Sequence, residues 1–208
     1  MMSPPFCLRR HRTKAVAGIY NADQLTEAQV AELLAEDAAL LFKDKELISE
    51  TSNGRSFCVH AFDRDFFLKE FKPRKWYRRG WEFFFPACHN NFHAGVRLLR
   101  RQVPTPAPLI SAVVQGRKRT RQLLVTEFCR DAVGLDEAMA TYKNNRRARL
   151  SDEVAALLAD FHCKGFYSRH LRSANILVRE QGRGWDFWFV DLDRLGGVLG
   201  HEAERQHH

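Results

Sequence analysis

The first regular pattern of apolar and polar positions lies in residues 23–41. Apolar side chains recur there at helical spacing between acidic ones, at Leu25, Val30, Leu33, Leu34, Leu40 and Leu41. That spacing places them on one face of an amphipathic helix, for which Asp23 is a candidate N-cap. Residues 1–22 combine prolines with basic residues and show no periodicity, so we expect no regular element in them.

Strand-like alternation follows in residues 47–71. Phe57 and Val59 alternate with polar neighbours, and a turn at residues 63–65 leads into an extended run that ends at Phe71. Alternation with a period of two is typical of half-buried strands. This segment therefore predicts a hairpin.

The same criteria predict the remaining elements. They are a helix at 87–101, a hairpin at 109–114 and 122–128, helices at 135–142 and 151–164, and a hairpin at 176–178 and 187–190. The helix at 87–101 ends before the proline-rich segment 103–106, because a residue that precedes proline is disfavoured in a helix. Ser151 is a candidate start and Gly165 a candidate end of the last helix. A β-rich first half thus precedes a mainly helical half, an order typical of an α+β fold with antiparallel strands.

Charge is the most informative part of the composition. The 208 residues are 45% hydrophobic, enough for one domain or two small lobes, and carry 33 Lys and Arg against 25 Asp and Glu. The basic excess is concentrated between Phe71 and Thr126, where Glu82 is the only carboxylate. Such a surface attracts nucleotides, nucleic acids, phosphorylated glycans or an anionic membrane.

The cysteines and the apolar runs indicate a cytoplasmic location. The five cysteines are odd in number and form no C-x-x-C pair, which argues against a disulfide framework or a zinc site. Residues 1–14 lack the apolar stretch of a secretory signal. No run approaches the roughly 18 apolar residues of a membrane span.

Three separated segments carry the residue types that phosphoryl transfer requires. They are the strand segment with Lys69, the loop that ends at Asn175, and Asp191 directly after an apolar run. A lysine can hold nucleotide phosphates, and amide and carboxylate oxygens can bind Mg²⁺. In this order the segments resemble the motif set of protein kinases.

Two further segments resemble one branch of that fold, the lipopolysaccharide kinase (Kdo/WaaP) family. Residues 98–109 are similar to its proline-rich segment, and residues 123–128 to the strand that enters its hinge. The resemblance covers roughly residues 50–195 and implies a two-lobed, protein-kinase-like α+β fold. The expected parts are an N-terminal extension with one helix at 1–45, an antiparallel N-lobe at 46–128, and a short, mainly helical C-lobe at 129–208.

The resemblance also implies roles for individual residues, with ATP and Mg²⁺ as cofactors. Lys69 is expected to contact the nucleotide phosphates, and Glu127 and Phe128 to lie at the hinge beside the adenine. Asn175 and Asp191 are the expected Mg²⁺ ligands, and Asp193 is a second acidic candidate.

The catalytic loop departs from the family pattern. His170 precedes Asn175 by the interval that separates the family's catalytic aspartate from its asparagine, so His170 occupies the aspartate's place. Arg172 replaces the usual lysine and keeps a cation near the transferring phosphate. The expected helix at 87–101 contains no acid that could pair with the strand lysine, and Glu82 lies before it.

On these observations a basic nucleic-acid-binding protein unrelated to kinases is the weakest hypothesis, and two functions rank above it. One is an ATP-dependent kinase that acts on a lipopolysaccharide core sugar or a similar glycoconjugate. The other is a catalytically degenerate pseudokinase that serves as a nucleotide-binding or regulatory module. The missing loop aspartate, the missing helix glutamate and the short end, with only 17 residues after Asp191, favour the second. The expected phosphate-covering loop, which ends at Gly54, also departs from the family pattern in having a single glycine. The short end indicates either a minimal C-lobe or a fragment.

The basic and aromatic stretch 71–81 bears on the partners. It is either a solvated basic face, a contact with a phosphorylated glycolipid at an anionic membrane surface, or a binding surface for single-stranded nucleic acid. No known nucleic-acid-binding module is present, so lipid ranks above nucleic acid. We therefore expect a phosphorylated glycolipid or sugar acceptor and peripheral contact with the inner membrane face. The oligomeric state has no signature in the sequence.

Overall fold

The computed structural model describes residues 6–34, 46–52, 54–72, 86–115, 120–168, 171–192 and 195–197. The chain divides into two compact units. The first comprises Met1–Val96 and Pro106–Phe128, and the second comprises Arg97–Thr105 and Cys129–His208. Among the described residues, no helix is both long and apolar enough to cross a membrane.

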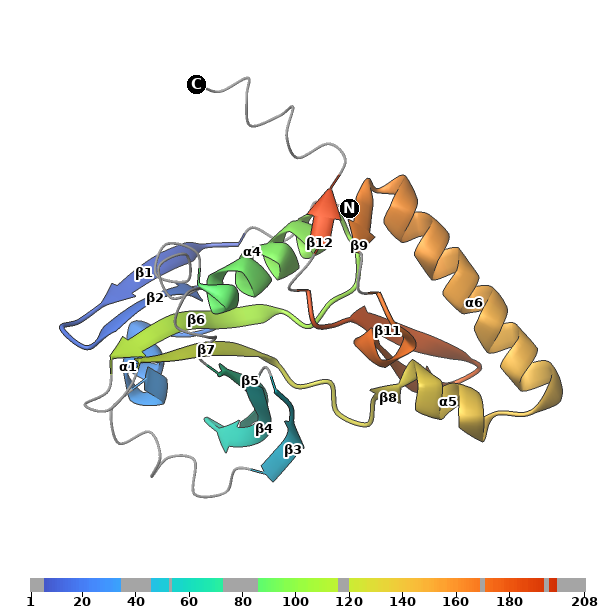
Figure 1. The fold of residues 1–208 in the computed structure, drawn as a ribbon, viewed down its shortest axis with the longest axis horizontal. Helices are drawn as coiled ribbons and strands as arrows, with labels where there is room; N and C mark the ends of the chain where they lie inside the picture. The colour runs from blue at the N-terminus through green and yellow to red at the C-terminus, as the bar shows by residue number, and fades with distance from the viewer. Residues whose placement is uncertain are drawn as a thin grey trace. The chain divides into compact units, whose positions relative to one another are not determined.

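Seven strands form one antiparallel sheet in the first unit (Figure 1). They are Leu8–Arg12 (β1), Val16–Asn21 (β2), Glu46–Glu50 (β3), Gly54–Ala61 (β4), Arg64–Phe71 (β5), Pro108–Gln115 (β6) and Thr120–Glu127 (β7). Their order across the sheet is β1-β2-β6-β7-β5-β4-β3. The hairpins β4–β5 and β6–β7 confirm the two hairpins expected in this part of the chain. Phe62 and Asp63 make the first turn, both with positive φ.

Strands β1 and β2 correct the expectation that residues 1–22 lack regular structure. β1 reads Leu-Arg-Arg-His-Arg and has no apolar alternation, and His11 is its one buried residue. It is an edge strand that pairs with β2, which in turn pairs with β6. Basic side chains are favoured on edge strands because they discourage pairing with another chain. Pairing with distant strands therefore creates structure that the local pattern does not reveal.

The first helix, Glu27–Leu34 (α1), begins later than Asp23. Thr26 and Gln29 form a capping box: the Gln29 N–H donates to Thr26 Oγ1 at 3.3 Å, and the Thr26 N–H donates to Gln29 Oε1 at 2.9 Å. Asp23 instead accepts the N–H of Cys7 at 2.7 Å. The expected extent of the helix beyond Leu34 lies outside the described residues.

Among the described residues, one helix packs against each face of the sheet. On one face α1 covers a core that includes Phe66, Leu68 and Val125. On the other, the helix Ala87–Arg100 (α4) covers a smaller core, which contains Cys88, Phe92, Val96 and Leu124. α4 confirms the helix expected at 87–101. None of the five cysteines forms a disulfide.

The described part of the second unit contains two α-helices, a 3-10 helix and short strands (Figure 1). They are Val133–Gly134 (β8), Leu135–Thr141 (α5), Asn144–Cys163 (α6), Phe166–Ser168 (β9), the 3-10 helix Ser173–Asn175 (η2), Ile176–Gln181 (β10), Gly184–Phe189 (β11) and Leu195–Gly197 (β12). β10 and β11 confirm the third expected hairpin. The core centres on Phe161, whose ring centre lies 5.7 Å from that of Phe166 and 4.6 Å from that of Phe189.

Helix α6 corrects the expected start at Ser151. The Ser151 hydroxyl donates to the carbonyl oxygen of Arg147 inside the helix, at 3.0 Å. Residues 144–149 before it are exposed and mostly polar, and tertiary contacts hold them: Arg146 stacks on Tyr142, and Arg149 donates to the carbonyl oxygen of Arg183.

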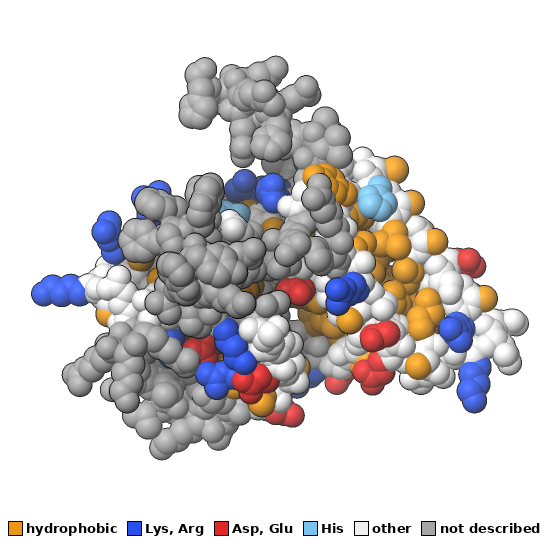
Figure 2. All heavy atoms as spheres, viewed as in Figure 1, with side chains coloured by type: hydrophobic (Ala, Val, Ile, Leu, Met, Phe, Trp, Pro, Cys, Tyr) orange, Lys and Arg blue, Asp and Glu red, His pale blue; other side chains and the backbone are white. Residues whose placement is uncertain are grey.

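Further along α6 the buried residues are few, and hydrophobic side chains gather over this helix on the visible face (Figure 2). Gly165 ends the helix with a φ of 81°, as expected.

Gly54 lies where β4 passes close to the backbone of β5. A Cβ at this position would lie 2.5 Å from the carbonyl oxygen of Glu70. Gly54→Ala should therefore push the strands apart and lower the free energy of unfolding by ~1–3 kcal/mol. Gly184→Ala is the control, because the nearest atom to its Cβ is a flexible Glu153 oxygen at 4.0 Å. Urea unfolding should show the loss only for Gly54→Ala, and equal losses would contradict this account.

Candidate functional site

Lys69 lies in the middle of the sheet of the first unit. It pairs with Ser56 of β4 and with Leu124 of β7. Directly paired residues point to the same face of a sheet, and Leu124 packs against α4. Lys69 is therefore on the face that α4 covers. Its Nζ lies 5.3 Å from the ring centre of Phe71.

Helix α4 presents no carboxylate to this face, because it contains no acidic residue. Its polar groups include the Cys88 thiol and the His89 imidazole. Burial raises the pKa of the Cys88 thiol to about 11. Burial, with His93 nearby, lowers the pKa of His89, which hydrogen-bonds Ser111. Both groups are therefore neutral at pH 7. Glu82, the other acid considered for Lys69, lies outside the described residues.

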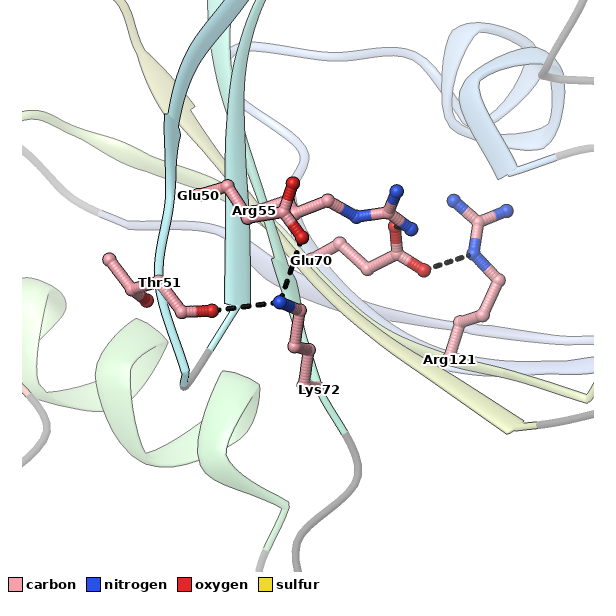
Figure 3. Close-up of polar contacts among 6 residues, drawn as sticks. All are labelled: Glu50, Thr51, Arg55, Glu70, Lys72 and Arg121. Atoms are coloured by element: carbon pink, nitrogen blue, oxygen red, sulfur yellow. Dashed lines mark hydrogen bonds and ion pairs between the residues drawn. The ribbon is translucent and has the colours of Figure 1, made fainter.

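Glu70 points to the opposite face and anchors a ladder of charges (Figure 3). It is 7% exposed, and its carboxylate accepts hydrogen bonds from Arg121 Nε at 2.9 Å and from Arg55 Nη2 at 3.4 Å. Arg55 is directly opposite Glu70 in the ladder, and Glu50 is directly opposite Arg55. Charges of alternating sign thus cross β3, β4, β5 and β7. They favour one register of β5, and with it the face on which Lys69 lies.

Lys72 joins the end of β5 to the turn between β3 and β4 (Figure 3). Its Nζ donates to Glu50 Oε1 at 2.8 Å and to the carbonyl oxygen of Thr51 at 2.9 Å. The hydrogen bond and the positive charge lower the pKa of the Glu50 carboxyl. The Thr51 N–H donates to the carbonyl oxygen of Gly54 and closes the turn. The turn that the sequence indicates as a phosphate cover is thus tied to the strand of Lys69. Asn53 in that turn lies outside the described residues.

Glu127 and Phe128 lie where the chain leaves the first unit. The Glu127 N–H donates to the carbonyl oxygen of Ala107 at 3.0 Å, and the Glu127 carbonyl oxygen accepts the Thr126 hydroxyl at 3.0 Å. The Glu127 carboxylate lies 3.8 Å from Arg64. The side chain of Phe128 is half-buried.

The second unit brings Asn175 and Asp191 to the same end of the β10–β11 hairpin. Ile176 pairs with Phe189, and the Val190 N–H donates to the carbonyl oxygen of Asn175 at 2.9 Å. Asp191 follows with a φ of 55°. This left-handed conformation is strained for a residue other than glycine, and such strain concentrates at functional sites.

An amide oxygen and a carboxylate are ligands that Mg²⁺ accepts, and Mg²⁺ usually takes its other ligands from phosphates and water. The pair of Asn175 and Asp191 therefore fits this ion. In the part of the chain that the structure describes, no group of three or more His, Cys, Asp or Glu side chains could hold a metal by itself. Asp193, the third candidate ligand, lies outside the described residues.

The catalytic loop is described only at its two ends, because His170 lies outside the described residues. The Leu171 N–H donates to the carbonyl oxygen of Ser168 at 3.5 Å, and Ser168 pairs with Leu195. The loop therefore starts at the two-stranded ladder β9–β12, and the segment that follows Asp191 ends at the same ladder. Arg172 is exposed, and its carbonyl oxygen accepts the Asn175 N–H at 2.9 Å.

Sequence reasoning missed two supporting residues. Glu70 lies at one of the alternate buried positions of β5, together with Phe66 and Leu68. A charge at a buried position needs partners, so the alternation of this strand could have indicated it. Thr105, whose buried hydroxyl donates to the carbonyl oxygen of Phe189, had no such signal.

The comparisons with known proteins bear on the family and on the fold. The model of the lipopolysaccharide kinase (Kdo/WaaP) family matches residues 51–207, and no curated protein matches the chain. Among solved structures, WaaP in complex with acyl carrier protein matches with a TM-score of 0.57 and 18% identity, over 83% of this chain and 72% of that one. A double mutant of the PknI kinase domain from Mycobacterium tuberculosis matches with a TM-score of 0.50 and 15% identity, over 71% and 58%. These likenesses confirm the protein-kinase-like α+β fold.

Replacing Glu70 with Gln should destabilise the protein by ~1–2 kcal/mol, because it removes a buried charge and leaves two arginines behind. The loss stays moderate because the guanidinium side chains of Arg55 and Arg121 are 35% and 31% exposed and can turn to water. Glu50→Gln alters an exposed carboxylate of the same ladder and should change stability little. Urea unfolding of both variants is the measurement. A neutral Glu70→Gln would show that the ladder does not hold β5.

Proposed function

The chain belongs to the lipopolysaccharide kinase (Kdo/WaaP) family, and from this premise we propose that it uses ATP and Mg²⁺ to phosphorylate a sugar hydroxyl. The acceptor would be the lipopolysaccharide core or a similar glycoconjugate. The placement of Asn175 and Asp191 at one end of the β10–β11 hairpin carries the proposal, because it assembles two oxygen ligands at a strained strand end.

Each proposed role follows from the chemistry of the side chain. Lys69, on the strand that β4 and β7 hold in register, would contact the nucleotide phosphates. The backbone of Glu127 and Phe128 would meet the adenine. Asn175 and Asp191, with Asp193, would bind Mg²⁺, which when bound neutralises charge on the phosphate oxygens. Arg172 would add a cation beside the transferring phosphate.

The acceptor and the partners are proposals supported by charge. A net charge of +8 favours a phosphorylated glycolipid or sugar and peripheral contact with an anionic membrane face. The basic and aromatic stretch 71–81 is the candidate contact, although residues 73–81 lie outside the described residues. WaaP was solved in complex with acyl carrier protein, and a protein partner of that class is a further possibility to test for this chain.

A pseudokinase is the second candidate function, and His170 is the observation that favours it. An aspartate in this place accepts a hydrogen bond from the attacking hydroxyl and orients it. A neutral imidazole can accept as well, but below its pKa, ordinarily ~6.5, it becomes a cationic donor. In that case the chain would bind nucleotide without rapid transfer.

Asp191→Ala should abolish the Mg²⁺-dependent stabilisation of the protein by ATP, whereas Asp193→Ala should weaken it less. Asp191 follows the apolar strand end directly, and bound ligand at a hundredfold its Kd adds ~2.7 kcal/mol of stability. Thermal unfolding with ATP, with and without Mg²⁺, is the measurement. Asp152→Ala, which alters an exposed carboxylate on α6, is the control. Equal losses from Asp191→Ala and Asp193→Ala would show that the metal role is shared or misassigned.

His170→Asp separates the two candidate functions. If the chain is a kinase limited by a weak base, the substitution should raise phosphate transfer or ATP hydrolysis, by up to the ~10²–10⁴-fold that general bases contribute. In a pseudokinase neither rate should change. Radiolabelled phosphate transfer to a glycolipid extract and ATP hydrolysis are the measurements. A wild-type turnover of ~1–100 s⁻¹ that survives His170→Ala would show that the loop is misplaced.

A further inference from the structure

Thr105 makes a buried hydrogen bond to the strand that leads to Asp191. It lies between α4 and β6 and is 6% exposed. Its hydroxyl donates to the carbonyl oxygen of Phe189 at 2.7 Å, across 84 positions of the chain. The Phe189 N–H donates to the carbonyl oxygen of Pro104 at 2.9 Å. Residues 104 and 105 thus hydrogen-bond both the backbone N–H and the backbone carbonyl oxygen of Phe189.

The segment that carries Thr105 is itself firmly held. Gln102 has a φ of 56°, and the Val103 N–H donates to the carbonyl oxygen of Leu98 at 2.9 Å. These are the features of a Schellman cap, including burial of Leu98 and Val103 in one core. Lys164 Nζ donates to the carbonyl oxygen of Gln102 at 2.8 Å. The backbone just before Thr105 is therefore held in place, so the Thr105 hydroxyl can hold Phe189 in a defined position.

The chain from Phe189 to Asp191 is held on its other side by Asn175, which accepts the Val190 N–H. Asp191 then adopts its left-handed conformation. A non-glycine residue keeps such a conformation only where the surrounding structure imposes it. The contacts of residues 104 and 105 are part of what imposes it.

The hydroxyl of Thr105 is not needed to fill space. Phe189, its partner, is 1% exposed and packs against Phe161 in an apolar core. Valine has nearly the shape of threonine and would fill the same volume. A hydroxyl in this core is satisfied only in the orientation that meets the Phe189 carbonyl oxygen.

We propose that Thr105 is a positioning residue for Asp191, acting through the backbone of Phe189. This inference rests on the proposed role of Asp191 as a Mg²⁺ ligand. Groups that orient a metal-binding side chain without contacting the metal change the affinity for the metal. They should change the affinity for the metal-free nucleotide less.

The test compares Thr105→Val with Thr105→Ser, which keeps the hydroxyl. Thermal unfolding at fixed ATP is followed as Mg²⁺ is titrated, and ATP binding is measured separately with EDTA present. Thr105→Val should need about tenfold more Mg²⁺ for half of the effect, and Thr105→Ser should match wild type. ATP binding without metal should be the same in all three proteins. An unchanged Mg²⁺ requirement, or equal losses with and without metal, would overturn the proposal.

Amide hydrogen exchange keeps this test separate from the proposed function. In Thr105→Val, or in Thr105→Ala if the valine variant does not fold, the Phe189 and Val190 amides should exchange faster, while those of the β6–β7 hairpin should not. Unchanged exchange at Phe189 and Val190 overturns the role of Thr105 whatever the ligand does. If exchange is faster but wild-type protein shows no Mg²⁺-dependent ATP binding, the role of Thr105 in holding the strand stands, and the proposed function fails.

Discussion

The hydrogen bond from the Val190 N–H to the carbonyl oxygen of Asn175 ends the β10–β11 hairpin and determines where Asp191 lies. A slip of β11 by one residue would separate Asp191 from Asn175 and turn Phe189 out of the core, because neighbouring strand residues face opposite sides. Burial of Phe189 therefore protects the geometry of the candidate metal site. The same core holds Leu98 and Val103, so the segment after α4 is part of the support.

In the first unit, strand register likewise determines where a candidate site residue, Lys69, lies. Lys69 and Glu70 are adjacent, and the pleat sends one to the face of α4 and the other to the opposite face. The buried Glu70 carboxylate finds its partners only when β4, β5 and β7 are correctly aligned. Its charge thus specifies the alignment, even though a buried ion pair by itself is weak evidence for stability.

The two candidate functions differ at a single step. In both, Lys69, Asn175 and Asp191 are the proposed residues for positioning phosphates and metal, and their side chains are of the types that nucleotide binding needs. Activation of the acceptor would depend on the residue in the place of His170. Because these groups are chemically independent, nucleotide binding can persist where transfer is slow. The chain belongs to a kinase family, and in the proposed mechanism the residue at position 170 would set the rate of transfer.

The sequence by itself determined the hairpins β4–β5, β6–β7 and β10–β11 and the helix α4, because alternation, helical spacing and turn residues act over a few positions. It also indicated Lys69, Asn175 and Asp191 through their motifs, although their roles stay proposals. Only the tertiary structure decided that β1 and β2 exist, that α6 begins at Asn144, and which groups support the site. Glu70 and Arg121 are 51 positions apart, and Thr105 and Phe189 are 84 apart. Partners at such separations leave no local pattern, since folding alone brings them together.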